Sequence, residues 1–150
     1  MSDYEAIRSV VSAYCHITDR AAENGETPDL TALFHPEAIL SYSFEGWEKH
    51  VGRDAVVNWY HRYLGKRASF YRFTRHKIFE PYIVISGDAA EVSTHVDADS
   101  VDYSGVLKVM AGRYDDWLVK VDGKWLIKER QGHIHYIFNG ASTQPFKGWR

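Results

Sequence analysis

Apolar side chains recur at helical spacing near the N-terminus of the chain. The recurring positions are Ile7, Val11, Tyr14 and Thr18. Intervals of three and four residues place these side chains on one face of a helix. Ser2 or Asp3 suits the capping position, and the polar run at 23–26 ends the pattern. The sequence therefore predicts a long N-terminal helix with one buried face.

Two more helices and a strand are predicted before residue 70. A proline suits the first turn of a short helix at 27–34, and Pro36 prevents that helix from continuing. Polar and apolar residues alternate at 38–44, which indicates a strand, and a loop carrying Trp47 follows. A third helix is expected from about residue 53 to residue 65.

From residue 69 onward the pattern changes to extended segments. The segments are 70–79, 82–86 continuing into 89–100, 106–121, and 124–138, with turn signals at 86–88 and 121–124. Helices followed by long antiparallel strands predict an α+β fold. We expect one domain, residues 1–150, in which a curved sheet wraps over three N-terminal helices and leaves a conical cavity between the layers.

Composition excludes several classes of function. A net charge of −2 provides no basic surface for nucleic acid. The one cysteine, Cys15, cannot form an intramolecular disulfide and is expected to be structural. No run approaches the ~18 apolar residues of a membrane span, and the N-terminus shows no signal peptide, so a cytoplasmic protein is expected. Aromatic residues make up 15% of the chain, which fits an aromatic pocket or an aromatic core.

Asp19 and His76 are the candidate catalytic pair. Asp19 borders the buried face of the first helix, and His76 shares a strand face with Thr74 while Arg75 points the other way. A carboxylate that holds one ring nitrogen of a histidine sets its tautomer, which suits proton transfer near neutral pH. The competing interpretations are a pairing of Asp19 with the neighbouring Arg20, a pairing with His16 on the same helix, or a purely structural histidine.

Five further residues are candidates for the pocket. Tyr42 could join the catalytic pair, because its hydroxyl and that of Tyr114 could stabilise a developing enolate; packing as plain rings is the competing interpretation. Tyr14 and Thr18 lie beside Asp19 on the first helix, and Trp47 sits in a loop that could cover the pocket.

The alternating acidic strand does not predict a metal site. His95, Asp97 and Asp99 share one strand face, but Val96 and Ala98 occupy the other, which reads as core. The acidic set is therefore expected to face solvent or a neighbouring subunit. His133 and His135 are expected to be structural, and no metal or cofactor is expected.

An apolar strip predicts self-association. Trp117, Val119 and Val121 share the strand face opposite Tyr114. If Tyr114 faces the cavity, this strip is exposed, and such strips often mark association surfaces. We expect a homo-oligomer, either a dimer or a trimer, with a small molecule as a further partner.

Several short motifs, in order, carry a resemblance to a known family. They are Tyr14 through Asp19, the run 33–38 leading into Tyr42, the Gly52-Arg53-Asp54-Ala55 helix start, Thr74-Arg75-His76, Gly112 through Asp116, and Asp122 through Ile127. With them the chain resembles SnoaL-like members of the nuclear transport factor 2-like superfamily, nearest in layout to the scytalone dehydratases.

The resemblance implies a cone-shaped barrel of a mainly antiparallel mixed sheet around a hydrophobic pocket, and cofactor-free hydro-lyase chemistry by an Asp–His pair. The family's helix-one aspartate, pocket histidine and strand-one tyrosine match Asp19, His76 and Tyr42. Four family positions depart. Thr18 replaces a companion tyrosine, Gly112 and Tyr114 replace a serine and an asparagine, and no second histidine stands near 100–102.

The leading hypothesis is a cofactor-independent hydro-lyase acting on a small hydroxylated cyclic ketone or a similar apolar molecule. The same scaffold supports isomerases, cyclases and epoxide hydrolases. An epoxide hydrolase would need a water-activating set such as Asp19, Arg75 and Asp97 or Asp99. Strand alternation argues against this set, because it points Arg75 away from His76. A non-catalytic binding protein, or a structural subunit like the small subunits of ring-hydroxylating dioxygenases, would also be compatible with this sequence.

Overall fold

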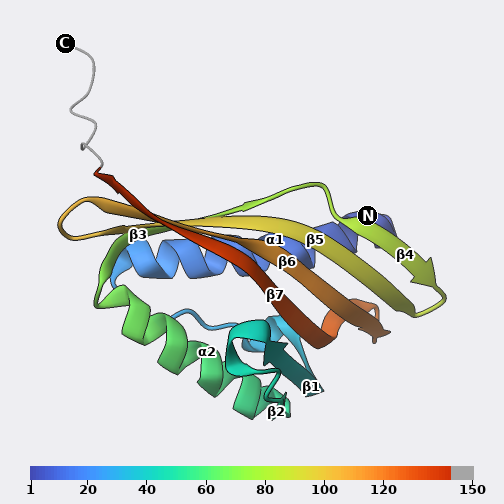
Figure 1. Cartoon of the computed structure of the whole chain (residues 1–150). Coiled ribbons are helices and arrows are strands. Elements are labelled where there is room, and N and C mark those ends of the chain that lie inside the picture. The colour runs from blue at the N-terminus through green and yellow to red at the C-terminus, as the bar shows by residue number, and fades with distance from the viewer. Residues whose placement is uncertain (143–150) are drawn as a thin grey trace.

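Two helices lie on one side of a seven-stranded mixed sheet (Figure 1). The computed structural model describes residues 1–142 of the chain. The helices are α1 (Asp3–Asn24) and α2 (Arg53–Ala68), and two 3-10 turns are η1 (Thr31–Leu33) and η2 (Ser43–Glu45). The strands are β1 (Phe34–Tyr42), β2 (His50–Val51), β3 (Tyr71–Ile78), β4 (Tyr82–Ser86), β5 (Ala89–Asp102), β6 (Val106–Val121) and β7 (Lys124–Ser142). Within the described part of the chain, no helix has the length and apolar character to cross a bilayer.

The sheet is mainly antiparallel and does not close into a full barrel. Its order is β2-β1-β7-β6-β5-β3, with β4 also paired to β5, and only β1 and β7 run parallel. Three register shifts interrupt the long β6–β7 ladder. Such bulges bend a strand and increase its twist, which lets the long strands curve over α1. The predicted α+β fold with a curved mixed sheet is confirmed.

The prediction of three helices was wrong at residues 27–34. This segment forms only the short turn η1, and β1 already begins at Phe34. The Asp29 side chain accepts a hydrogen bond from the Thr31 amide at 3.0 Å, a local turn that competes with a helix. Phe34 is fully buried and pairs with Ile127 of β7. Pairing with β7 therefore outweighs the weak helix signal of so short a segment.

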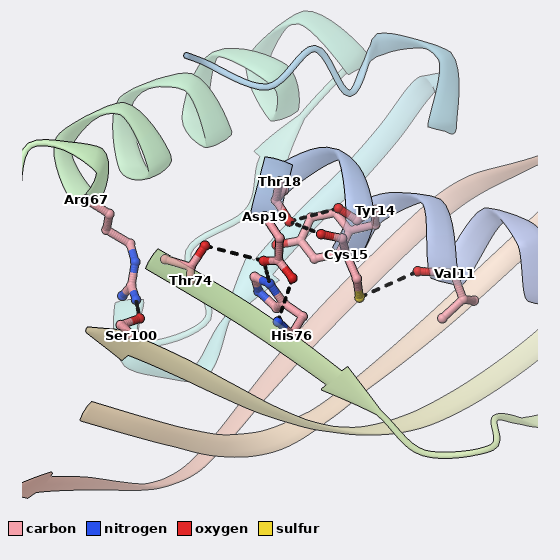
Figure 2. Close-up of polar contacts among 9 residues, drawn as sticks. All are labelled: Val11, Tyr14, Cys15, Thr18, Asp19, Arg67, Thr74, His76 and Ser100. Atoms are coloured by element: carbon pink, nitrogen blue, oxygen red, sulfur yellow. Dashed lines mark hydrogen bonds and ion pairs between the residues drawn. The ribbon is translucent and has the colours of Figure 1, made fainter. Parts of the chain in front are cut away.

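The first helix has the ends and the buried face that its sequence indicates. The Ser2 hydroxyl accepts from the Glu5 amide and the Glu5 carboxylate accepts from the Ser2 amide, which caps the N-terminus. Gly25 ends the helix at φ 69°, a conformation that glycine adopts without strain. Ile7, Val11 and Tyr14 are buried against the sheet. Asp19 therefore lies in the part of α1 that passes over β3 (Figure 2).

A charged pair lies at the centre of the core. Arg130 on β7 and Asp116 on β6 are register partners, and both side chains are 0% exposed. Nε and Nη2 of Arg130 donate to Oδ1 and Oδ2 of Asp116, each at 2.8 Å. The guanidinium lies 4.4 Å from the ring centres of both Tyr14 and Tyr114. Burial opposes the Arg130 charge, but Asp116 outweighs it, so the pKa of Arg130 is raised.

The predicted association strip lies on the sheet face that carries no described helix. Val121 is 39% exposed, whereas Trp117 and Val119 are half-buried. The strip is therefore less exposed than the sequence suggested. A homo-oligomer that uses this face stays a prediction.

Replacing Asp116 by asparagine should lower the free energy of unfolding by about 3–5 kcal/mol, because Arg130 would keep a buried charge without a counter-ion. Urea unfolding measures the change. The control is Glu37→Gln, which breaks a pair with Lys128 in which the Glu37 side chain is 78% exposed. That change should stay below about 1 kcal/mol. Equal stability of the two variants would contradict a structural role for the pair.

Stability should fall at alkaline pH. Burial raises the pKa of Tyr14, Tyr42 and Tyr114 well above the ordinary 10.0, and raises the pKa of Cys15 from 9.0 to about 11. These groups ionise more easily in the unfolded chain, so their contribution is complete below pH 9 and is lost as pH rises above it. Urea midpoints measured on either side of pH 9 test this. Ionisation of the three tyrosines near 10.0 with the fold intact would contradict it.

Candidate acid–base site between the first helix and the sheet

Asp19 and His76 meet where α1 crosses β3 (Figure 2). Asp19 Oδ1 lies 2.6 Å from His76 Nδ1, and Asp19 Oδ2 accepts from the His76 backbone amide at 2.8 Å. The Thr74 hydroxyl donates to Oδ1 at 3.3 Å. The His76 side chain is 9% exposed and that of Asp19 is 21% exposed. A carboxylate 57 positions away in sequence thus binds both the backbone and the ring of His76.

This contact sets the proton positions on the imidazole. An ionised carboxylate can only accept, so Nδ1 of a neutral His76 carries the proton and Nε2 keeps its lone pair. No described residue forms a hydrogen bond with Nε2. His76 also contacts the Tyr14 ring edge-on, with ring centres 5.6 Å apart. The ring is therefore held on one side and free to exchange a proton on the other.

The competing arrangements of these residues do not form. His16 and Arg20 are exposed, and neither bonds to Asp19. Arg75 is exposed on the opposite strand face from His76, where the adjacent Lys77 pairs with Asp99 at 2.9 Å. An Asp–Arg–Asp set for epoxide opening is therefore not assembled around Asp19.

An internal cavity borders the imidazole. Its lining residues are Tyr14, Thr18, Ala22, Glu26, Pro28, Tyr42, Phe44, Tyr63, Leu64, Arg67, Ala68, Thr74, His76, Ala98, Ser100, Met110 and Tyr114. The space among these residues is about 600 Å³, including volume open to solvent, and only a small part of it is wide enough for a water molecule. The cavity is thus a narrow, mainly apolar slot with a few polar groups, as small-molecule sites commonly are.

Four of the five pocket candidates lie in this lining, namely Tyr14, Thr18, Tyr42 and Tyr114. The exception is Trp47, which is not part of it. Its ring packs edge-on against His133, with centres 4.7 Å apart, and it is 42% exposed. The loop ends in the β2 pairing with β1, and this holds Trp47 over β7 rather than over the cavity.

Thr18 is turned away from a ligand role by its own helix. Its hydroxyl donates to the backbone carbonyls of Tyr14 and Cys15, at 2.8 and 2.9 Å. It therefore presents mainly its methyl group, so the companion tyrosine of the family has no polar substitute here.

Tyr42 is held in place from three sides. Its hydroxyl lies 3.0 Å from that of Tyr60, and its ring stacks on Trp59 at 4.9 Å. On another side is Gly132, where any Cβ would collide with the Tyr42 ring. The glycine therefore leaves the space that the tyrosine fills, and the ring has little freedom to turn.

A buried cation acts on this tyrosine pair. Burial raises the pKa of Tyr60, and the Arg130 charge opposes the rise. Arg130 Nη1 donates no hydrogen bond of good geometry to any described residue. The guanidinium therefore attracts the Tyr60 hydroxyl oxygen by its charge alone. Burial also keeps the Tyr42 hydroxyl protonated, because its pKa is raised. Tyr42 therefore enters the cavity as a neutral hydrogen-bond donor or acceptor.

Arg67, Ser100 and Tyr63 are cavity residues that the sequence patterns did not single out. Ser100 follows Ala98 on the buried face of β5, and that alternation was the signal that could have found it. Arg67 gave no signal, because it lies in what looked like the end of the third helix. The helix runs on to Ala68 and carries Arg67 to the cavity.

Among the described residues, no three His, Cys, Asp or Glu side chains are grouped closely enough to hold a metal ion. His95 is exposed and Asp99 pairs with Lys77, while Val96 and Ala98 are buried. The acidic strand face thus points away from the core. His133 contacts Asp115 at 3.1 Å beside Trp47.

Solved structures with the same fold cover nearly the whole chain. A proposed scytalone dehydratase from Novosphingobium aromaticivorans DSM 12444 is 25% identical, covers 97% of this chain and 94% of its own, and superposes with a TM-score of 0.72. The hexachlorocyclohexane dehydrochlorinase LinA-type3 from Novosphingobium barchaimii LL02 is 16% identical, with coverages of 96% and 94% and a TM-score of 0.75. The type 2 form of LinA is 18% identical, with coverages of 95% and 91% and a TM-score of 0.75.

A search of the curated proteins found no match. The family match is decisive because it spans most of the described chain and includes both Asp19 and His76. The SnoaL-like domain model matches residues 1–131. The resemblance inferred from the motifs is confirmed, and the chain belongs to the SnoaL-like domain family, with the nuclear transport factor 2-like fold.

Proposed function

We propose that this protein is a cofactor-independent lyase that removes water from a small hydroxylated cyclic ketone. The observation that carries the proposal is the Asp19–His76 contact of 2.6 Å beside an apolar cavity. A base with a fixed tautomer and a free nitrogen, in a slot with few polar groups, suits proton abstraction next to a carbonyl.

In the proposed reaction, Nε2 of His76 removes a proton from the carbon next to the carbonyl. The electron pair of the broken C–H bond moves toward the carbonyl oxygen and forms an enolate. The enolate then collapses, a C=C bond forms, and the C–O bond to the β-hydroxyl breaks. The proton held on Nε2 passes to the departing hydroxyl, which leaves as water. Asp19 stabilises the imidazolium between the two steps.

Tyr42 is the proposed donor to the enolate oxygen. The two hydroxyls share a hydrogen bond in which either could be the donor; in the proposed arrangement the Arg130 cation attracts the Tyr60 oxygen, Tyr60 donates to Tyr42, and the Tyr42 proton remains for the ligand. A donor oriented before the reaction costs no reorganisation when charge develops. Tyr114 lines the same cavity, but its hydroxyl has no hydrogen-bond partner among residues 1–142. Its ring packs against the Arg130 guanidinium and forms one wall of the cavity.

The comparisons support an elimination. The structure at 25% identity is named for loss of water, and the dehydrochlorinases are named for loss of hydrogen chloride. Both names describe removal of a proton from one atom and a leaving group from its neighbour. We assign the proton abstraction to His76. The proposed leaving group is hydroxide, because the protonated imidazole can supply the proton that turns it into water.

Replacing His76 by asparagine should reduce turnover by about 10²–10⁴-fold, because the general base is lost. The probe is 3-hydroxycyclohexanone, and the ultraviolet absorbance of the product enone follows the reaction. The control is His16→Asn on the exposed side of α1, which should keep full activity. Full turnover by the His76→Asn protein, or no enone formed by the unmodified protein, would refute the proposal.

Replacing Tyr42 by phenylalanine should lower kcat by about 10²–10³-fold, with a smaller change in KM, because the hydroxyl acts on charge that develops during the reaction. The control is Tyr82→Phe, at a side chain that is 73% exposed. A thermal melt of each variant checks the fold. If KM rises while kcat is unchanged, Tyr42 contributes to binding only and the assigned role is wrong.

A further inference from the structure

We propose that the ligand of this cavity carries a carboxylate, which Arg67 binds at the end of the slot away from His76. The inference deepens the proposed function by naming a class of substrate, a cyclic ketone with an acidic group across the ring. It rests on the proposed function only for the chemistry at the His76 end.

Arg67 is placed firmly but only by neutral partners. It lies in the last turn of α2 and reaches down to the sheet, where Nη2 donates to the Ser100 hydroxyl at 2.6 Å (Figure 2). Nη1 donates to the Tyr63 hydroxyl at 3.2 Å. The guanidinium carbon lies 4.8 Å from the Tyr71 ring centre and 5.4 Å from that of Tyr63. The side chain is thus oriented before any ligand arrives.

No carboxylate of the described chain neutralises Arg67. Three described arginines pair with acids, namely Arg8 with Glu80, Arg113 with Asp115, and Arg130 with Asp116, whereas Arg67 reaches the cavity without such a partner. Glu26 lines the same cavity, yet it forms no ion pair with Arg67. The C-terminal end of α2 carries only a partial negative charge. A half-buried guanidinium with this environment favours an anion brought by the ligand.

The donors of Arg67 suit a carboxylate. A guanidinium has five N–H groups in one plane, and two of its nitrogens already hold hydroxyl oxygens. The remaining N–H groups can bind a planar carboxylate, for which this geometry is well matched. Leu64, Met110 and Phe44 make the neighbouring walls apolar, so the rest of the ligand needs no further charge.

The sheet register gives the spacing along the strand between the two ends of the proposed ligand site. Ser100 pairs with Thr74, and Ala98 pairs with His76, so the Arg67 contact lies two residues along the strand from His76. Two residues of a strand span ~7 Å. We therefore propose a ligand about the size of one six-membered ring, with its carbonyl and its carboxylate at opposite ends.

The surface outside Arg67 favours the same orientation. A second, open pocket shares Tyr63 and Arg67 with the cavity and also includes Lys66. Its lining contains one carboxylate, Asp102, which accepts hydrogen bonds from Ser104 and the Val106 amide. Lys66 and Arg67 carry two positive charges at this opening, and Asp102 carries one negative charge that is already hydrogen-bonded. The net positive charge attracts an acidic ligand to this end.

The test compares 4-oxocyclohexanecarboxylate with the uncharged 4-oxocyclohexanecarboxamide, using titration calorimetry on the full-length protein. The two compounds have the same ring and ketone, so a difference reports the charge. We expect the carboxylate to bind about tenfold more tightly or better, as a charged hydrogen-bonded contact should. Arg67→Gln should weaken carboxylate binding about tenfold and leave amide binding within about twofold.

Three variants complete the design. Arg67→Lys keeps the charge, so it should retain part of the preference for the carboxylate. Ser100→Ala keeps the guanidinium and should retain most of the preference for the carboxylate. This protein is the second variant to measure if Arg67→Gln does not fold. Arg62→Gln removes the same charge from an exposed position on α2 and should change neither affinity.

Equal binding of the two compounds, no binding of either at millimolar concentration, or an equal loss of both in Arg67→Gln would overturn the inference. The His76→Asn protein should keep the preference for the carboxylate, because the proton chemistry is not needed for binding. If His76 proves dispensable for turnover while the preference remains, the proposed function fails and the ligand class stands. If turnover depends on His76 but the preference is absent, only this inference fails.

Discussion

A guanidinium that is 0% exposed is the constraint around which the core is arranged. Arg130 must be compensated, and Asp116 does so with two hydrogen bonds from the adjacent strand. The faces of Tyr14 and Tyr114 complete its surroundings. These same rings form the wall of the cavity, so the group that holds the sheet core together also defines one side of the site. A change in this charge would move the walls of the pocket as well as reduce stability.

Asp19 contacts both the sheet backbone and the candidate catalytic histidine. One of its oxygens holds the β3 backbone and the other holds the imidazole, so it fastens α1 to the sheet while it sets the tautomer of His76. A side chain with both tasks is difficult to replace, because asparagine could keep one contact and would lose the charge that stabilises an imidazolium. The free nitrogen of His76 then faces a slot in which few groups compete for a proton.

The cavity is polarised along its length. The candidate base His76 lies on the β3 wall, the Tyr42 hydroxyl lies on the β1 wall beside that of Tyr60, and a guanidinium lies at the end of α2. Apolar side chains separate these groups, and in such surroundings electrostatic contacts weigh more than in water. The three groups come from elements that are far apart in the chain, and the order of the sheet brings them to one side.

Local patterns in the sequence determined much of this protein. The spacing of Ile7, Val11 and Tyr14 set the buried face of α1, and strand alternation put Thr74 and His76 on one face with Arg75 on the other. Periodicity predicts such features because it depends on near neighbours alone. The short helix at 27–34 failed for the opposite reason, since pairing of Phe34 with a strand more than ninety residues away outweighed its local preference. Only the tertiary structure decided which charges are compensated: Arg130 has Asp116, Arg67 has hydroxyls alone, and Trp47 packs on His133. A charge is stabilised by whatever lies within a few ångströms of it, and for these side chains that is settled by distant parts of the chain.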